Sequence, residues 1–205
     1  MRIEELKPSK HVKGRFLVKL EDGSLLKVTE SEVLEFALAV GRELEEETLT
    51  ALGMAARRSS VKSTAANIIG SRALSKKELT DRLVRKGAEA EEAEEAAGWL
   101  EDIGALDDRA YAAMVARRCA SRGYGPAHVR EELRRRGVAR DLWDEAMEEL
   151  PDPAETLDDL IQKRCRGDLS DRRELKRVSD GLLRRGFAWE DVKAALRRYT
   201  EIQED

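Results

Sequence analysis

Arginine is the residue type in this sequence whose spacing most clearly suggests chemistry. Six arginines gather in and around the stretch GYGPAHVREELRRRGV, residues 123–138, namely Arg117, Arg118, Arg122, Arg130, Arg134 and Arg135. A guanidinium group is planar and can bind a carboxylate or a phosphate through two parallel hydrogen bonds. Arg130 and Arg134 are four residues apart and would share one helix face, away from the apolar Val129 and Leu133. We therefore expect these six arginines to contact a partner.

The residues that could do covalent or metal chemistry lack the spacing that such chemistry requires. Cys119 and Cys165 form no close-spaced metal or redox pattern, and they cannot build a usual metal site with His11 and His128. The sequence contains neither a phosphate-binding loop of the Lys-Ser/Thr kind nor a serine nucleophile elbow. Each cysteine is expected to be a small buried apolar residue, and His128 is expected to be exposed. We predict a binding protein without catalytic residues, cofactor or metal.

Three glycines account for part of the arginine pattern. Gly87, Gly137 and Gly186 each follow a basic residue, and each has a leucine four residues before it and an apolar residue directly after it. A glycine just past a helix end can adopt the left-handed conformation that closes the helix, while the residue after it packs on that leucine. A basic residue before the glycine complements the negative end of the helix dipole. One basic residue per helix end is thus explained, and the surplus of arginines is available to a partner.

The glycine pattern belongs to a repeat with a period of about fifty residues. Upstream of each glycine, apolar residues recur at i, i+3, i+4 and i+8, which is one face of a helix. The three sets are Ala65, Ile68, Ile69, Ala73; Tyr111, Met114, Val115, Cys119; and Leu157, Leu160, Ile161, Cys165. A further helix follows each glycine, and its tryptophan (Trp99, Trp143 or Trp189) is expected in the core. We predict three units of three short helices, at residues 61–106, 107–151 and 152–205.

Residues 1–60 differ from the repeats and form an extension that contains a β-hairpin and a helix. The segment RFLVKLEDGSLLKVT alternates around Asp22-Gly23, which is a strong hairpin signal. Because a two-stranded hairpin is marginal alone, we expect a third strand or a packed helix beside it. Helix N-caps are predicted at Thr29, Ser75, Asp107 and Asp152, the first two with a glutamate three residues on that completes a capping box.

Composition favours a mainly α-helical protein. Charged residues make up 39% and aromatic residues 4% of the chain, which argues against a large β-type core. The net charge of −4 gives no general attraction to nucleic acid, although residues 109–150 hold nine basic and seven acidic residues. No apolar run approaches the roughly 20 residues of a membrane span, and the start lacks the apolar segment of a signal peptide. We expect a cytoplasmic protein with no membrane contact.

The sequence resembles the RecX family of bacterial recombination regulators. The agreement is closest in GYGPAHVREELRRRGV, with LDDRAYAAMVARR just before it and SRALSKKELTDRLVRKG in the first unit. The resemblance covers about residues 61–203, and the hairpin-bearing start is similar to the N-terminal extension of some members. It implies three tandem three-helix repeats in an elongated, curved array.

The resemblance also implies a partner and an action. RecX family members bind the RecA recombinase filament on single-stranded DNA and limit its ATP hydrolysis, strand exchange and co-protease activity, in DNA repair, homologous recombination and the SOS response. For this chain it implies a non-enzymatic inhibitor of RecA, which we expect to be a monomer. The mildly acidic composition makes direct contact with single-stranded DNA a weaker expectation than contact with RecA. Two alternatives stay open: a helical-repeat nucleic-acid-binding module, whose affinity would fall steeply with salt, and a purely structural adaptor.

Overall fold

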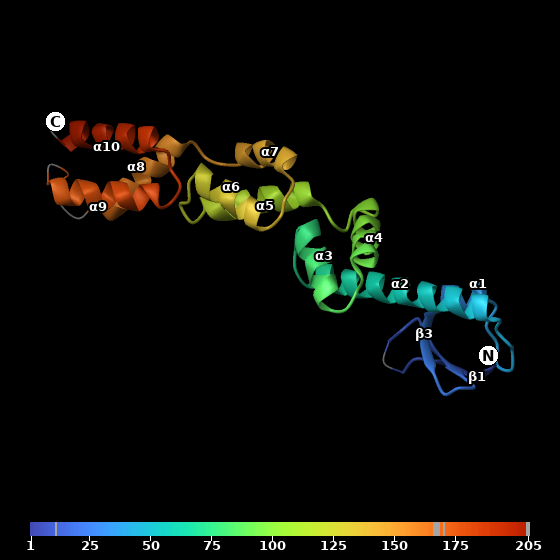
Figure 1. Cartoon of the computed structure of the whole chain (residues 1–205). Helices are drawn as coiled ribbons and strands as arrows, with labels where there is room; N and C mark the ends of the chain where they lie inside the picture. Colours follow the sequence, from blue (N-terminus) through green and yellow to red (C-terminus); the bar gives the residue numbers. More distant parts are fainter. Residues whose placement is uncertain (11, 166–168, 170, 204–205) are drawn as a thin grey trace. The chain divides into compact units, whose positions relative to one another are not determined.

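The computed structural model describes residues 1–10, 12–165, 169 and 171–203, and the chain is mainly helical with a small antiparallel sheet at its start (Figure 1). It divides into two compact units: residues 1–72 with 79–105, and residues 73–78 with 106–205. Helix α3, Lys76–Arg85, contributes its first turn to the second unit and its remainder to the first. The predicted mainly α class is confirmed, and so is the hairpin near the start.

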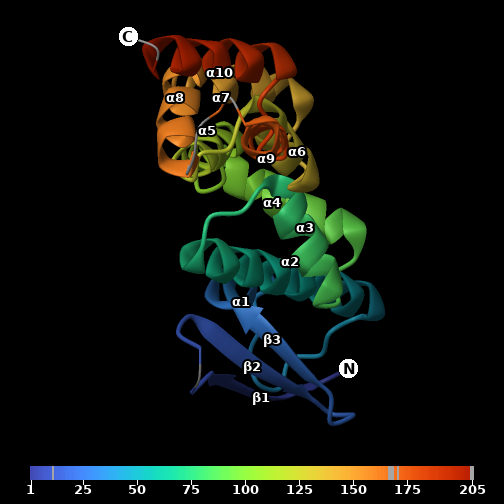
Figure 2. The same cartoon turned by 90° about the vertical axis from the view of Figure 1, so that its left-hand side faces the viewer.

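The first unit begins with a three-stranded antiparallel sheet in the order β1-β2-β3, with bounds Ile3–Pro8, Arg15–Leu20 and Leu25–Thr29. Gly23, in the turn between β2 and β3, has a φ of 84°, a left-handed value that glycine adopts without steric cost. Strand β1 is the third strand that the hairpin requires. Helix α1, Glu30–Glu35, follows, and Figure 2 shows the next helix, α2 (Glu46–Ser71), lying across the sheet. Ile3, Val18 and Val28 are fully buried in the core of this unit.

Helix α2, Glu46–Ser71, is one continuous helix of 26 residues. The boundary predicted between residues 60 and 61 falls inside it, so the first three-helix unit takes its first helix from the end of a longer one. The helix ends because Arg72 is extended, with φ −166° and ψ 149°. Ala73 therefore lies outside the helix and is exposed, so its predicted place on the apolar helix face is wrong. Leu74 is buried instead, at 4% exposure.

Ion pairs join α2 to α4, Ala90–Asp102, which packs along it. The Arg57 side chain lies 2.6 Å from a carboxylate oxygen of Glu92, and the Lys62 amine lies 3.0 Å from Glu95. The acidic stretch of α4 is thus partly neutralised by the basic residues of α2. The buried side of α4 consists of small residues and Leu100, which allow the two helices a close approach.

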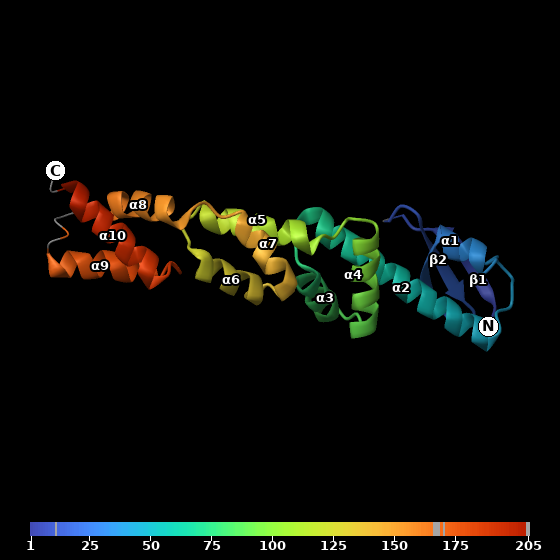
Figure 3. The ribbon, with the colours of Figure 1, turned by 90° about the horizontal axis from the view of Figure 1, so that it is seen from above.

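The second unit contains two successive groups of three helices (Figure 3). The middle group comprises α5 Asp108–Ala120, α6 Pro126–Arg135 and α7 Trp143–Glu148, the last preceded by a short 3-10 turn at Arg140–Leu142. The third group comprises α8 Pro153–Arg164, α9 Arg172–Leu183 and α10 Trp189–Gln203. Each group has its own apolar core, with Leu133 fully buried in one and Leu182 in the other.

The three predicted helix-stop glycines have the expected geometry. The φ angles are 97° at Gly87, 68° at Gly137 and 87° at Gly186. In each case the amide of the next residue donates a hydrogen bond to the carbonyl of the leucine four residues before the glycine, at 3.1, 3.1 and 3.5 Å respectively. This pattern is the helix-closing motif in which glycine avoids the steric cost of a Cβ. Gly104 and Gly123 close α4 and α5 in the same way, which sequence reasoning did not predict.

The predicted N-caps are all confirmed, whereas one tryptophan prediction is wrong. Thr29 and Ser75 form capping boxes with the glutamates three residues on, and the carboxylates of Asp107 and Asp152 accept hydrogen bonds from the first turns of α5 and α8. Trp99 and Trp143 are half-buried. Trp189 is 52% exposed, because α10 enters the core only one turn later, at Val192.

Candidate protein-binding surface

Two helices and the turn between them position the six predicted arginines. Arg117 and Arg118 lie in the last turn of α5, Arg122 follows in the turn, and the other three lie on α6. Pro126 starts α6, where the missing N–H costs nothing. Val129 and Leu133 are fully buried, so the core fixes which side of α6 faces solvent. All six arginines are exposed.

Three of the six arginines are already paired with acids of the same unit. The Arg134 guanidinium donates to both carboxylate oxygens of Glu131, at 2.9 and 2.6 Å, and Arg135 donates to both oxygens of Glu132, at 3.0 and 2.8 Å. These bonds raise the pKa of both arginines, and the bond from Arg135 is the main reason that the pKa of Glu132 falls to about 2. Arg117 lies 3.0 Å from Glu149. Their charge is therefore largely balanced at short range.

The remaining three arginines keep their charge unpaired. Among the described residues, the side chains of Arg118, Arg122 and Arg130 have neither an ion pair nor a hydrogen bond. A partner that binds them does not first have to break an internal contact. They are the arginines of the predicted set with the largest capacity for a new carboxylate or phosphate.

Arg136, the basic residue directly before Gly137, is committed to the fold. Its guanidinium donates to the hydroxyl of Tyr111 at 2.5 Å and to a carboxylate oxygen of Glu132 at 2.8 Å. The Tyr111 hydroxyl in turn donates to Glu78, in the first turn of α3, at 2.6 Å. Burial is the main reason that the pKa of Tyr111 rises to about 12, so its hydroxyl stays protonated as a donor. The arginine thus links α6 to α5 and to the first turn of α3.

Backbone atoms also take part in the contact between the first turn of α3 and the end of α6, which lies within the second compact unit. The Ser75 hydroxyl donates to the carbonyl of Arg136. A Cβ built on Gly137 would lie 2.3 Å from the Lys77 side chain, so the glycine serves a close approach as well as the helix stop. Sequence reasoning missed this second role, because the contact joins segments about sixty residues apart.

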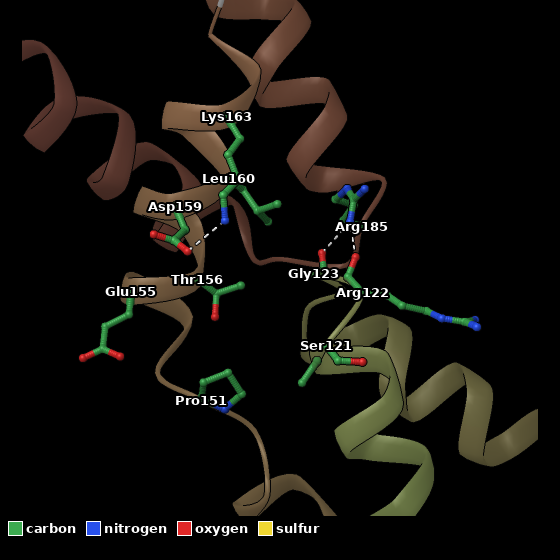
Figure 4. A pocket seen from close by; sticks show the side chains of 11 residues that line it. Ser121, Arg122, Gly123, Pro151, Glu155, Thr156, Asp159, Leu160, Lys163 and Arg185 are labelled. Atoms are coloured by element: carbon green, nitrogen blue, oxygen red, sulfur yellow. Dashed lines mark hydrogen bonds and ion pairs between the residues drawn. The ribbon is translucent and has the colours of Figure 1, made fainter.

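A similar arginine contact joins the third helical group to the middle one (Figure 4). The Arg185 guanidinium donates to the carbonyls of Arg122 and Gly123, at 2.7 and 2.8 Å, and lies over the ring of Tyr124 at 5.4 Å. The side chain of Arg122 extends away from this contact (Figure 4). The amide of Gly125 donates to the carbonyl of Arg185 at 2.8 Å. Arg185, like Arg136, is therefore a structural contact.

The residues considered for covalent or metal chemistry are placed as follows. Cys119 is buried as predicted, and burial raises the pKa of its thiol, which disfavours the reactive thiolate. Cys165 is half-buried just past the end of α8. His128 is half-buried rather than exposed, with its ring stacked on Tyr124 at 3.8 Å, and His11 lies outside the described residues.

Within the described ranges, no group of three or more His, Cys, Asp or Glu is arranged to hold a metal ion. In that same part of the chain, no helix is long and apolar enough to cross a membrane.

Both helical groups of the second unit match family models. Residues 107–147 match the second three-helix domain of RecX, and residues 152–196 match its third three-helix domain. The first match contains all six predicted arginines. Each match lies inside a predicted unit, with a start at or near the predicted boundary.

Curated proteins of known family are similar over most of the chain. The regulatory protein RecX of Xanthomonas axonopodis pv. citri is 34% identical over 162 residues, which cover 77% of this chain and 91% of that protein. The regulatory protein RecX of Stenotrophomonas maltophilia is 37% identical over 128 residues, or 60% of this chain and 77% of that protein.

Two solved structures resemble the fold. A crystal structure of regulatory protein RecX superposes with a TM-score of 0.77 at 25% identity, and covers 95% of this chain and 98% of the other. RecX from Lactobacillus salivarius superposes with a TM-score of 0.58 at 17% identity, over 71% of this chain and 97% of the other.

Proposed function

We propose, from the premise that this chain belongs to the RecX family of regulatory proteins, that it binds the RecA filament on single-stranded DNA and restrains it. Its regulatory role rests on the family. The inhibition of ATP hydrolysis, strand exchange and co-protease activity is our proposal for this chain. We propose that it acts by binding alone, as a cytoplasmic monomer whose repeats lie at residues 61–106, 107–151 and 152–205.

The observation that carries the proposal is the unpaired positive charge on the middle helical group, α5 to α7. Arg118, Arg122 and Arg130 are exposed, and the described residues satisfy none of their side chains. Truncating an exposed side chain usually changes stability by no more than about 0.5 kcal/mol, so these arginines can be tested without loss of the fold. We assign them as the principal contacts, and we assign Arg117, Arg134 and Arg135 a lesser part because each already has an acidic partner.

A matched pair of triple variants tests this assignment. The variant Arg118→Ala/Arg122→Ala/Arg130→Ala should weaken inhibition of the DNA-dependent ATPase of RecA by at least about tenfold in the concentration required. The control Arg117→Ala/Arg134→Ala/Arg135→Ala removes the same number of charges and should weaken inhibition less. Equal losses in both variants, or full inhibition by the first with an unchanged circular dichroism spectrum, would show that the surface is wrongly placed.

Nucleic-acid binding is the second candidate, and one group of arginines in the third helical group favours it. The pKa of Arg164 is lowered by burial and then by repulsion from Arg185, Arg177 and Arg184, so four arginines lie near one another there, of which Arg177 is paired with Glu174. Binding of the wild-type chain to single-stranded DNA without RecA, with a steep loss of affinity as salt rises, would support this candidate. Weak DNA binding together with strong inhibition of RecA would support the filament instead.

A further inference from the structure

An open groove of about 700 Å³ lies between α9 and α10 in the third helical group. Trp189, at the start of α10, is 52% exposed, and Leu175, on α9, is 36% exposed. Leu196 lies seven residues after Trp189 and hence on the same side of α10. The three side chains line the groove and give it an apolar floor.

The groove continues the core face of α9 beyond the core. Leu175 is three residues before Val178 and seven before Leu182, both of which are buried, so all three lie on one face of the helix. Leu175 lies one turn before Val178 on this face and is 36% exposed, whereas Val178 is 2% exposed. An apolar core face that runs on into an exposed groove is typical of a site that accepts a partner helix.

The middle helical group has different residue types at the positions that line this groove in the third helical group. Counted from the closing glycine, Arg140 occupies the position of Trp189, and Pro126 that of Leu175. In the same count Asp144 corresponds to Lys193 and Glu148 to Arg197. The third unit therefore has an exposed aromatic residue and basic residues where the middle unit has a charged residue and acids.

Basic residues surround the apolar floor. Among the described residues, the groove is lined by Arg172, Lys176, Lys193 and Arg197, with Asp180 as the single acid. Over the described part of the chain, Arg172, Lys176 and Lys193 have no ion-pair partner. The local charge is thus positive although the whole chain carries −4. A partner that places apolar side chains on the floor and carboxylates at the rim is complementary in both respects.

We propose that the groove between α9 and α10 is a docking site for an acidic amphipathic helix of another protein. Apolar anchors of that helix, spaced about one turn apart, contact Trp189, Leu175 and Leu196. Its Asp and Glu residues lie against Lys176, Lys193 and Arg172. This site differs from the arginines of the middle unit and does not depend on the identity of the filament partner.

Two labelled peptides that differ only in charge test the proposal with the full chain. Each is a designed amphipathic helix of about 16 residues, or roughly 24 Å, with identical Leu and Phe positions and either Glu or Lys at the polar positions. Fluorescence anisotropy should show that the Glu peptide binds at least about tenfold more tightly than the Lys peptide, and that this difference shrinks as salt rises. Equal binding of both peptides, or no binding of the Glu peptide, overturns the proposal.

Variants locate the binding on the groove. Trp189→Ala should lower the affinity for the Glu peptide by at least about tenfold, since tryptophans that become buried in an interface commonly dominate its affinity. Lys176→Glu/Lys193→Glu should do the same through charge. The controls are Leu34→Ala, which removes a side chain that is 75% exposed elsewhere, and Lys27→Glu/Lys86→Glu, which makes the same charge change in the first unit.

The controls should bind the Glu peptide as the wild type does. Loss of binding in the controls as well as in the groove variants would place the site elsewhere and overturn the proposal. Sedimentation that shows self-association, abolished by Trp189→Ala, would also overturn it, because a second copy of the chain would then occupy the groove.

Discussion

Replacing the helix-stop glycines one at a time separates their two roles, closing a helix and allowing a close approach. At Gly87 a Cβ would meet nothing within 4 Å, so Gly87→Ala changes only the conformational preference at φ 97°. At Gly125, which has an ordinary φ of −86°, a Cβ would lie 2.6 Å from the carbonyl oxygen of Gly186. Gly186 combines both features, with a φ of 87° and a Cβ position 2.5 Å from the backbone nitrogen of His128.

The expected costs follow from these distances. A left-handed conformation costs a non-glycine residue about 1–2 kcal/mol, which is the expected loss for Gly87→Ala. Gly125 is the N-cap residue of α6, and serine is also a good N-cap. The loss of folding free energy in Gly125→Ser therefore reports the steric clash alone, at about 1–3 kcal/mol. Gly186→Ala should lose about 2–5 kcal/mol, because both terms apply and backbone atoms cannot move aside as a side chain can. Gly137→Ala should lose a similar amount, since the atoms of Lys77 that obstruct it include the Cβ at 2.7 Å, whose position is set by the backbone.

Urea unfolding followed by circular dichroism gives the free-energy losses, and hydrogen exchange read by mass spectrometry assigns each loss to its unit. Gly87→Ala should raise exchange in the first unit. In the second unit, Gly125→Ser and Gly186→Ala should raise it first at the start of α6 and the end of α9, and Gly137→Ala first at the end of α6. The reasoning is refuted if Gly186→Ala costs no more than Gly87→Ala, or if Gly125→Ser unfolds at the wild-type urea concentration.

Two further predictions concern the contacts around Arg136. Tyr111→Phe removes the hydroxyl between Glu78 and Arg136 and should lower the free energy of unfolding by about 1–2 kcal/mol, whereas Tyr199→Phe, the control, should change it little. The pKa of Glu132 is lowered from 4.5 to about 2, so its ionised form stabilises the folded state above pH 4.5, and this contribution is lost as the pH falls towards 2. Glu132→Gln should flatten the stability profile over that range, and an equally steep fall in the variant would contradict the assignment.

Local signals in the sequence predicted the helix ends well. The closing glycines, the four N-caps and the hairpin turn each depend on residues within a few positions of one another, so their physical cause is readable from the chain. The end of α2 was not readable in this way. The repeat pattern placed Ala73 on a helix face, but the backbone becomes extended at Arg72 as the chain leaves α2.

The six arginines are exposed, in keeping with the prediction that they are available to a partner, but the pairing of three of them with acids was not predicted. The pairs Glu131–Arg134 and Glu132–Arg135 are three residues apart on a predicted helix, so this spacing could have revealed them. The commitment of Arg136 and Arg185 could not be read from the sequence. Tyr111 is brought near Arg136 by the packing of α5 against α6 within the middle group, and Gly123 is brought near Arg185 by the stacking of the third group on the middle one.

Both ends of α6 are held by neighbouring segments. At its start, the amides of Gly125 and Ala127 donate to the carbonyls of Arg185 and Gly186, and at its end the Ser75 hydroxyl donates to Arg136. A helix held at both ends has little freedom to tilt or fray. Binding to the outer face of α6 therefore sacrifices little conformational entropy beyond that of the arginine side chains themselves. Loosening either end should then slow association and weaken affinity without removing a single contact atom.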